Sequence, residues 1–502
     1  MFNLIEEEIG NKSVTENGAL GYESSKSALV DLNYQVSSLR NATEDEIIRL
    51  FDKAFYENKE YCVKWLFYAR DIREGLGERR LFRICYRRLV ELDVDIFYIN
   101  LNIISEYGRW DDLISLIGIS EVTDKRIITI LNSQLIKDLS NLKEGKPISL
   151  LGKWMPSENA SSRQTKELAR KICKLMELTP RKYRLMLSKL RKYLDVVEVK
   201  MCSNQWENID YGGVPSLANL KYKNAFLRHD EDRRREYLES VSKGTSNFNM
   251  KVANPVDVVS KYTNRSFRNF NDYDETLELA WKNLKDVNVS DTMVVADGSG
   301  SMTIPVSGRI TALDVAMALA IYTSEHNTGV YKDKYITFSY RPQFVDMSND
   351  NNLREKLIHS RQHHECSNTN IEAVFDLILN IAIKNDISNE DMIKNILIIS
   401  DMEFDEAQNS HWFRDESNPL TTTLFDEIKE RFNRVGYNLP KLIFWNVNSR
   451  TNTIPLMDNE LGVTLVSGFS QNVLKMVMSN KYNPYEVLIE TITNKRYDLV
   501  KV

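Results

Sequence analysis

The sequence contains few cysteines and few of the residues that make long flexible linkers. It has five cysteines, 19 glycines and 11 prolines among 502 residues. The cysteines are dispersed and lack Cys-x-x-Cys spacing, which favours reduced thiols in a cytoplasmic protein over a disulfide framework. The scarcity of glycine and proline argues against long disordered linkers. We therefore expect most of the chain to fold.

Long apolar runs and familiar catalytic motifs are also missing. No apolar run approaches the ~18 residues of a membrane span, so we expect no membrane segment. The first nine residues, MFNLIEEEI, are acidic, unlike a secretory signal. The chain has no Gly-x-x-x-x-Gly-Lys-Ser/Thr loop, no His-Glu-x-x-His and no Gly-x-Ser-x-Gly elbow. These absences predict a cytoplasmic protein that is not an enzyme.

The first half of the chain has the hydrophobic period of helices. Apolar residues recur there at three- and four-residue spacing, and no strand pattern interrupts them. The expected helices cover residues 43–56, 59–72, 79–92, 96–107, 124–140, 162–176, 180–194 and a region from 211 onward. Successive helices without strands are typical of an α-solenoid. Because no clear sequence repeat is present, we expect an irregular, HEAT-like helical-repeat module.

The second half changes to alternating strands and helices. Strands are expected at 292–296, 335–338, 396–399, 442–447 and 463–466, and helices at 312–325, 371–384, 420–435 and 471–478. This alternation predicts a doubly wound parallel sheet with helices on both faces. The length allows two or three domains. We place the all-α module at residues 1–285 and an α/β domain at residues 286–502.

A buried strand that ends in an Asp-x-Ser-x-Ser loop is the most informative motif. Asp297, Ser299 and Ser301 directly follow an apolar run. Ligands of open α/β sheets bind at the carboxyl ends of strands. Oxygen ligands without sulfur or imidazole suit Mg²⁺, with Mn²⁺ or Ca²⁺ as alternatives. Gly298 and Gly300 lie between these side chains, and we expect them to make the loop flexible.

Two later positions extend this candidate metal site. Thr369 precedes the helix expected at 371–384, and Asp401 follows the strand expected at 396–399. With the first three residues they resemble the metal-ion-dependent adhesion site of von Willebrand factor A domains. The resemblance implies that the serines bind the ion directly, the threonine directly or through water, and the aspartates often through waters. It also implies an open position for an acidic oxygen of a protein partner. The alternative is a hydroxyl and carboxylate network without metal.

Several segments carry a wider family resemblance. They are residues 28–32 (ALVDL), 68–79 (YARDIREGLGER), 107–113 (YGRWDDL), 153–157 (KWMPS) and 466–470 (VSGFS). A helical module followed by an A domain resembles the Ro 60-kDa autoantigen family, with its TROVE module, and more closely a large uncharacterised family of the same layout. The resemblance implies binding of small structured RNAs and of the single-stranded ends of misfolded RNAs.

The charge distribution offers an independent indication of RNA binding. Residues 161–200 hold twelve Lys or Arg and four Asp or Glu, a net charge of +8 in a chain whose net charge is −5. Phosphate contacts supply most non-specific nucleic-acid affinity, and Tyr183 and Tyr193 are candidates for base stacking. The alternative is two amphipathic helices with solvated faces. The candidate RNA-binding residues are Lys166, Arg170, Lys171, Lys174, Arg181, Lys182, Arg184, Lys189, Arg191, Lys192 and Lys200.

Three other charged or metal-like groups are weaker candidates. The run His363-His364-Glu365-Cys366 does not match the spacing of a structural zinc site, so we interpret it as a polar loop. Glu403, Asp405 and Glu406 are expected to form a solvated acidic loop rather than to tune the metal site. A second basic cluster, Arg228 and Arg233–Arg235, is nearly cancelled by nearby acids.

Two hypotheses follow. The first is a non-catalytic, monomeric RNA-binding protein of Ro type, with RNA on a basic helical surface and a divalent-metal A domain. The second is a metal-dependent protein-interaction scaffold that does not bind RNA. They differ in whether the basic residues of 161–200 share one exposed surface or are dispersed and paired with acids.

Overall fold

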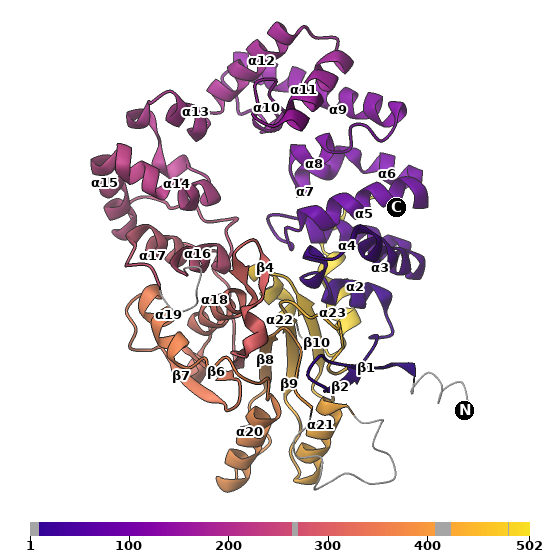
Figure 1. Ribbon diagram of the computed structural model, residues 1–502, viewed down its shortest axis with the longest axis vertical. Helices are drawn as coiled ribbons and strands as arrows, with labels where there is room; N and C mark the ends of the chain where they lie inside the picture. The colour runs from indigo at the N-terminus through magenta and orange to yellow at the C-terminus, as the bar shows by residue number, and fades with distance from the viewer. Residues whose placement is uncertain (1–9, 264–269, 407–422, 480) are drawn as a thin grey trace. The chain divides into compact units, whose positions relative to one another are not determined.

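The computed structural model describes residues 10–263, 270–406, 423–479 and 481–502 (Figure 1). They form two compact units. The sheet unit consists of Met1–Cys62 and Met250–Lys495, and the helical unit consists of Val63–Asn249 and Arg496–Val502. The first part of the chain therefore packs with its second half. The division of the chain between residues 285 and 286 stays a prediction.

The sheet unit is built around one six-stranded sheet. Its order is β10-β9-β8-β3-β6-β7, and every neighbouring pair is parallel except β6 and β7. The five predicted strands are present, and β7 is an additional antiparallel edge strand. Counted in chain order from that edge, the strands run 3-2-1-4-5-6, an order of doubly wound folds whose direction reverses between β3 and β8. The bounds are β3 (Thr292–Asp297), β6 (Lys334–Phe338), β7 (Gln343–Asp346), β8 (Asn395–Ser400), β9 (Lys441–Asn446) and β10 (Val463–Ser467).

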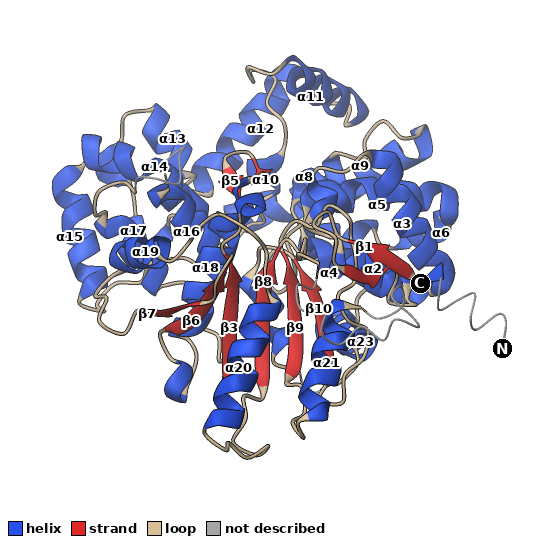
Figure 2. Ribbon diagram, turned by 60° about the horizontal axis from the view of Figure 1, so that its bottom comes forward, coloured by secondary structure: helices blue, strands red, loops and turns tan. Residues whose placement is uncertain are grey.

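Helices cover this sheet because its strands are apolar on both sides. Every residue of β3 and β9 is buried, as expected for central parallel strands. Helix α18 packs on β3, β6 and β8, and α20 and α21 lie in front of the sheet in Figure 2. Residues 420–422 of the helix predicted at 420–435 lie outside the described residues. The helices are α2 (Ala28–Tyr34), α3 (Glu44–Glu57), α16 (Pro255–Tyr262), α17 (Glu275–Lys282), α18 (Ala312–Glu325), α19 (Leu353–Gln362), α20 (Glu372–Lys384), α21 (Leu424–Arg434), α22 (Leu474–Val477) and α23 (Pro484–Ile492).

The N-terminal segment that joins the sheet unit begins with a short hairpin. Strands β1 (Lys12–Val14) and β2 (Leu20–Tyr22) pair antiparallel. Tyr22 then exchanges backbone hydrogen bonds with Ile454, each at 2.8 Å. Further along, Asn446 donates from its side chain to the carbonyl of Tyr34 at 2.9 Å. These contacts span more than 400 residues of sequence and explain why the N-terminal segment belongs to the same unit as β9 and the segment that follows it.

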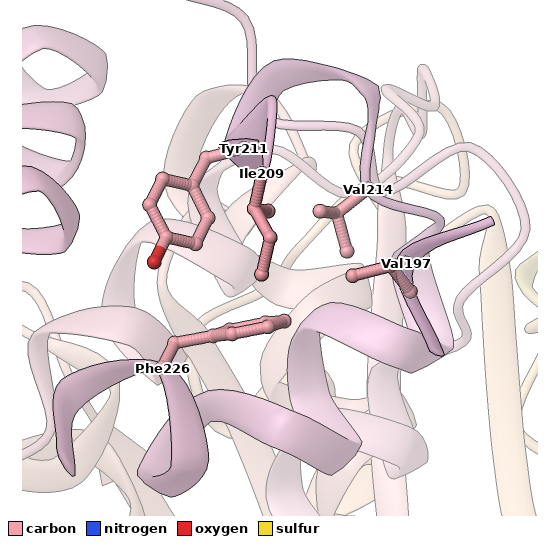
Figure 3. Packing of buried hydrophobic residues seen from close by; sticks show 5 residues of the cluster. All are labelled: Val197, Ile209, Tyr211, Val214 and Phe226. Atoms are coloured by element: carbon pink, nitrogen blue, oxygen red, sulfur yellow. The ribbon is translucent and has the colours of Figure 1, made fainter. Parts of the chain in front are cut away.

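The helical unit contains helices and no strand among its described residues. The predicted helix at 96–107 is divided into α6 and α7. The helix predicted at 79–92 has its predicted bounds, and the other predicted helices are present with shifted ends. One part of the core gathers Val197, Ile209, Tyr211, Val214 and Phe226 (Figure 3). The helices are α4 (Lys59–Arg70, which begins in the sheet unit), α5 (Arg79–Leu92), α6 (Val94–Ile99), α7 (Ile104–Tyr107), α8 (Trp110–Ile114), α9 (Glu121–Lys143), α10 (Leu151–Trp154), α11 (Arg163–Leu175), α12 (Pro180–Tyr193), α13 (Val197–Cys202), α14 (Ser216–His229) and α15 (Glu231–Ser242).

Two sequence expectations concern the chain as a whole. All five cysteines are free; Cys202 and Cys366 are exposed and the other three are buried. Within the described ranges, none of the helices combines the length and apolar character needed to cross a bilayer.

Candidate metal centre and basic surface

The Asp-x-Ser-x-Ser loop lies at the carboxyl end of β3, beside the point where the strand order reverses. Asp297 and Ser299 are buried. The Ser299 amide donates to Asp297 Oδ1 at 2.8 Å, so the loop turns back over the strand end. The hydroxyl oxygens of Ser299 and Ser301 lie 3.1 Å apart. The loop therefore brings one carboxylate and two hydroxyls together.

The second carboxylate comes from the end of the neighbouring strand β8. Asp401 is fully buried, and the Ser301 hydroxyl hydrogen-bonds to it. Ser400 donates to Asp297 Oδ2 at 2.5 Å, which joins the two strand ends. Burial, and then the nearby Asp401 carboxylate, raise the pKa of Asp297 to about 7. Burial also raises the pKa of Asp401, although Arg450 acts to lower it.

Thr369 lies on a loop whose backbone is hydrogen-bonded to the Asp-x-Ser-x-Ser loop. The Gly300 amide donates to the carbonyl of Ser367 at 3.1 Å, and the Cys366 amide donates to the carbonyl of Gly298 at 3.0 Å. Thr369 is buried, and its hydroxyl accepts from Asn17 Nδ2 at 3.3 Å. The structure thus links Asp297, Ser299, Ser301 and Asp401 through direct interactions and puts Thr369 on the adjoining loop.

The two glycines of this loop allow close packing against neighbouring residues, and the flexibility expected from them stays a prediction. A Cβ at Gly298 would lie 2.6 Å from His364 Nδ1 and 2.9 Å from Thr337 Oγ1. A Cβ at Gly300 would lie 3.2 Å from the carbonyl oxygen of Cys366. The absence of side chains lets the two loops approach each other.

This donor set fits a hard divalent cation. Two hydroxyl oxygens 3.1 Å apart match neighbouring corners of an octahedron, whose edge is about 3 Å for metal–oxygen distances near 2.1 Å. Carboxylates and hydroxyls without thiolate or imidazole favour Mg²⁺, Mn²⁺ or Ca²⁺. Among the described residues no group of three or more His, Cys, Asp or Glu could hold an ion. A metal here would therefore depend on the hydroxyls.

Two charged residues at this site were not identified correctly from the sequence. Arg450, which follows β9, donates from Nη1 to Asp401 Oδ2 at 3.0 Å. No motif marks it, and it is 49 positions from its partner. Glu403 was predicted in a solvated loop but is fully buried, because its carboxylate accepts the amides of Glu16, Arg450 and Thr451 at 2.6–2.9 Å.

The basic segment forms exposed stripes on α11 and α12. On α11, Lys166, Arg170 and Lys174 follow one another at four-residue spacing; Arg170 and Lys174 are exposed, and Lys166 is half-buried. On α12, Arg181, Lys182, Lys189 and Lys192 cover an arc of roughly 100°, given about 100° per residue. We call the residues of these two stripes the basic face; they are Lys166, Arg170, Lys174, Arg181, Lys182, Lys189 and Lys192. None of these seven cations forms an ion pair within the described chain.

Four other candidate RNA-binding residues have structural partners instead. Lys171 pairs with Asp124 at 2.7 Å, Arg184 with Glu158 at 2.9 Å and Lys200 with Asp195 at 2.6 Å. Arg191 donates to the carbonyls of Gly152 and Met155 and to the hydroxyl of Ser157 at 2.6–2.9 Å. These four therefore stabilise the helical unit first.

The two tyrosines of the segment differ in their availability. Tyr183 is completely buried and donates to the carbonyl of Pro156 at 2.8 Å, so the prediction that it stacks on bases is wrong. Tyr193 is 39% exposed and donates to the carbonyl of Lys146 at 2.9 Å. Its ring stays a candidate for base contact.

The second arginine cluster is part of the fold. Arg233 pairs with Asp230 and Arg235 pairs with Glu231. Arg234 is buried, and its guanidinium lies 5.0 Å from the ring centre of Tyr211 and 5.3 Å from that of Phe226. Cation–π contacts of this kind stabilise a core, so the basic face is the stronger candidate surface.

Comparison with known proteins identifies the family. Residues 15–129 and 125–292 match the family described as Domain of unknown function (DUF2828). The chain belongs to this family. Residues 291–497 match a second one, Domain of unknown function (DUF7788). A curated relative, Uncharacterized protein L728 of Acanthamoeba polyphaga mimivirus, is 32% identical over 525 residues, covering 96% of this chain and 88% of that protein.

A solved structure aligns over most of the chain at low similarity. It is titled crystal structure of Deinococcus radiodurans RO (RSR) protein, with 12% sequence identity and a TM-score of 0.35. The alignment covers 91% of this chain and 92% of that one.

The histidine run beside the cluster packs as part of a loop. His363 Nδ1 lies 3.2 Å from Gln343 Oε1, and His364 Nδ1 lies 3.4 Å from Thr337 Oγ1. The His364 Nε2 atom is buried and has no hydrogen-bond partner in the described part of the chain. Burial, with smaller effects of His363 and Arg361, lowers the pKa of His364 to about 4.

This lowered pKa predicts a loss of stability in mild acid. The unfolded chain takes up the proton near pH 6.5, well above the folded protein, so stability is full above that pH and falls as the pH drops toward 4. We expect His364 to account for roughly 1–3 kcal/mol of this loss. Urea unfolding of the wild type and of His364→Asn at several pH values would measure it. Parallel stability curves for the two proteins would contradict the prediction.

Proposed function

We propose that this protein binds RNA through the basic face. The observation that carries the proposal is that seven cations on α11 and α12, six of them exposed and Lys166 half-buried, have no acidic partner within the described chain. The sequence alone does not decide whether the basic residues are dispersed and paired with acidic residues. In the structure only a minority of the candidates, Lys171, Arg184 and Lys200, pair with an acidic residue. Unpaired cations along two helices are the type of surface that neutralises successive phosphates.

The expected ligand is RNA with a single-stranded portion. Phosphate contacts give affinity with little base specificity, and Leu185, 62% exposed between the basic residues of α12, adds apolar surface. The Ro-type resemblance favours small structured RNAs and the ends of misfolded RNAs. Under this proposal the protein is non-catalytic and monomeric, acts in the cytoplasm, and its helices form a HEAT-like, TROVE-like module.

A second function is supported by the hydroxyl and carboxylate cluster. We propose that the sheet unit is a von Willebrand factor A domain, because its strand order ends in an antiparallel edge strand and its cluster lies at the carboxyl ends of β3 and β8. Ser299 and Ser301 would bind a divalent ion directly, with Thr369 beside them and Asp297 and Asp401 supplying the negative charge. A bound Mg²⁺, or Mn²⁺ or Ca²⁺, would supply a position for an acidic oxygen of a protein partner.

Charge removal on the basic face tests the RNA proposal. The triple variant Lys174→Gln, Lys189→Gln, Lys192→Gln should bind an RNA hairpin with a single-stranded tail about 10–100-fold more weakly at low salt. The slope of log affinity against log salt should fall by about 2, since each phosphate contact contributes roughly 0.7–0.9. Fluorescence anisotropy across a salt series measures both quantities.

A matched variant controls for net charge. Lys125→Gln, Arg235→Gln and Lys243→Gln remove three exposed cations of the same unit that are already paired with glutamates. This variant should keep affinity close to that of the wild type. Equal losses in both variants, or wild-type binding no stronger than that of an acidic control protein, would reject the RNA proposal. Protein partners that survive nuclease treatment in a pull-down would then favour the scaffold hypothesis.

A further inference from the structure

The turn of the N-terminal hairpin, residues 15–18, docks beside the metal cluster. Thr15 donates from its hydroxyl to the carbonyl of Phe404 at 2.6 Å. The Glu16 amide donates to Glu403 Oε2 at 2.8 Å, and Asn17 Nδ2 donates to the carbonyl of Glu403 at 2.7 Å. The turn is therefore held on the loop that directly follows Asp401.

Two side chains of this turn extend to the cluster itself. Asn17 Nδ2 also donates to the Thr369 hydroxyl at 3.3 Å. The Glu16 carboxylate pairs with Arg450 at 2.5 Å, and Arg450 pairs with Asp401 at 3.0 Å. Arg450 thus connects an exposed carboxylate of the turn to a buried carboxylate of the candidate metal site.

The guanidinium of Arg450 and a divalent ion would compensate the same negative charge. The Asp401 side chain is fully buried and Oδ2 accepts from Arg450. Two cations brought close to one buried carboxylate repel each other strongly, since the surrounding dielectric is low. Arg450 is 26% exposed and Glu16 is 59% exposed, so both can move toward solvent without disturbing the core. Their mutual ion pair is of the exposed, weak kind.

We propose that Arg450 is a built-in competitor for metal binding at Asp401, and that the turn at residues 15–18 responds to this competition. Without a divalent ion, Asp401 keeps Arg450, and Arg450 keeps Glu16 and the turn in place. With the ion, Asp401 releases Arg450, and the turn loses its charged contact with the cluster. The proposal rests on the proposed metal site and adds a regulatory link to the N-terminal hairpin.

Affinity for Mn²⁺ in the full-length protein provides the first test. Arg450→Gln should bind Mn²⁺ about tenfold more tightly than the wild type in calorimetry, within the usual range of coupling between sites. Glu16→Gln changes only an exposed side chain and should tighten binding by a smaller factor. The control is Arg431→Gln, because Arg431 is another partly buried arginine of this unit with two carboxylate partners, Glu372 at 2.5 Å and Asp376 at 2.8 Å. It should leave the affinity unchanged.

Hydrogen exchange of the turn provides a second, independent test. The Glu16 and Ala19 amides are hydrogen-bonded in the docked turn. They should exchange faster in the wild type when Mn²⁺ is added, and fast in Arg450→Gln with or without it. Measurable Mn²⁺ binding with equal affinity in all variants and unchanged exchange would overturn the competition while leaving the metal site in place. No Mn²⁺ binding in any variant would overturn both. Should Arg450→Gln fail to fold, Glu16→Gln decides the outcome.

Discussion

Asp297→Ala should abolish the binding of Mn²⁺ and Mg²⁺ while the helical unit stays folded. Asp297 is fully buried at the end of β3, and both of its carboxylate oxygens are occupied, by the Ser299 amide and the Ser400 hydroxyl. Asp297 and Asp401 are the two carboxylates proposed to compensate the positive charge of the ion. Loss of Asp297 leaves Asp401 alone, already paired with Arg450, so we expect affinity to fall by at least about 100-fold.

The measurement is calorimetry with each ion on the wild type and the variant. Asp297→Asn is the companion, since it keeps the side-chain volume and removes the charge. Asp346→Ala, at the end of the edge strand β7, is a control in the same sheet and should bind the ion normally. Wild-type heats retained by both Asp297 variants would refute the metal site. Far-ultraviolet circular dichroism close to that of the wild type would show that the helices remain.

The sequence predicts regular elements well where local signals agree. The bounds of α18 (Ala312–Glu325) match the prediction because Thr311 and Asp314 form a capping box at its start, each accepting from the other's amide. Strand β3 is recognised because its middle, residues 293–296, is apolar and it ends at Asp297. The prediction at 96–107 is less accurate, because a helical period alone does not show that the chain breaks after Ile99.

Contacts between distant parts of the chain were not predictable in the same way. Strands β1 and β2 have three residues each, too few for a periodic signal, and their turn docks on residues nearly 400 positions away. Arg450 carries no motif. Glu403 lies in an acidic run that normally indicates solvent, yet three backbone amides surround its carboxylate. The burial of Tyr183 does have a sequence signal. Tyr183, Leu187 and Leu190 follow helical spacing on one face, which indicates that the tyrosine faces the core.

The segments that carry the family resemblance have a clear structural role in the helical unit. Asp112, from the YGRWDDL segment, is fully buried and accepts from Arg70, of the YARDIREGLGER segment, at 2.7–2.8 Å. It also accepts from Arg83 at 2.8 Å and from the Arg109 amide at 2.9 Å. A Cβ at Gly108 would lie only 2.5 Å from its Oδ2 atom. Residues of the two segments therefore form a buried ion network that joins α4, α5 and α8.

Asp112→Ala should consequently destabilise the helical unit by about 3–5 kcal/mol, because removing one partner of a buried ion pair leaves the other charge uncompensated. Arg70 has a side chain only 2% exposed, so it cannot reach water without local unfolding. Urea unfolding followed by circular dichroism measures the change.

Asp112→Asn should be milder, since an amide oxygen still accepts hydrogen bonds. Gly108→Ala should also destabilise the unit because of the close approach to Asp112. Glu144→Ala removes an exposed ion pair with Lys146 on the same unit and should leave the midpoint near that of the wild type. A loss below about 1 kcal/mol for Asp112→Ala would mean that Arg70 finds another partner and that the network does not hold the unit together.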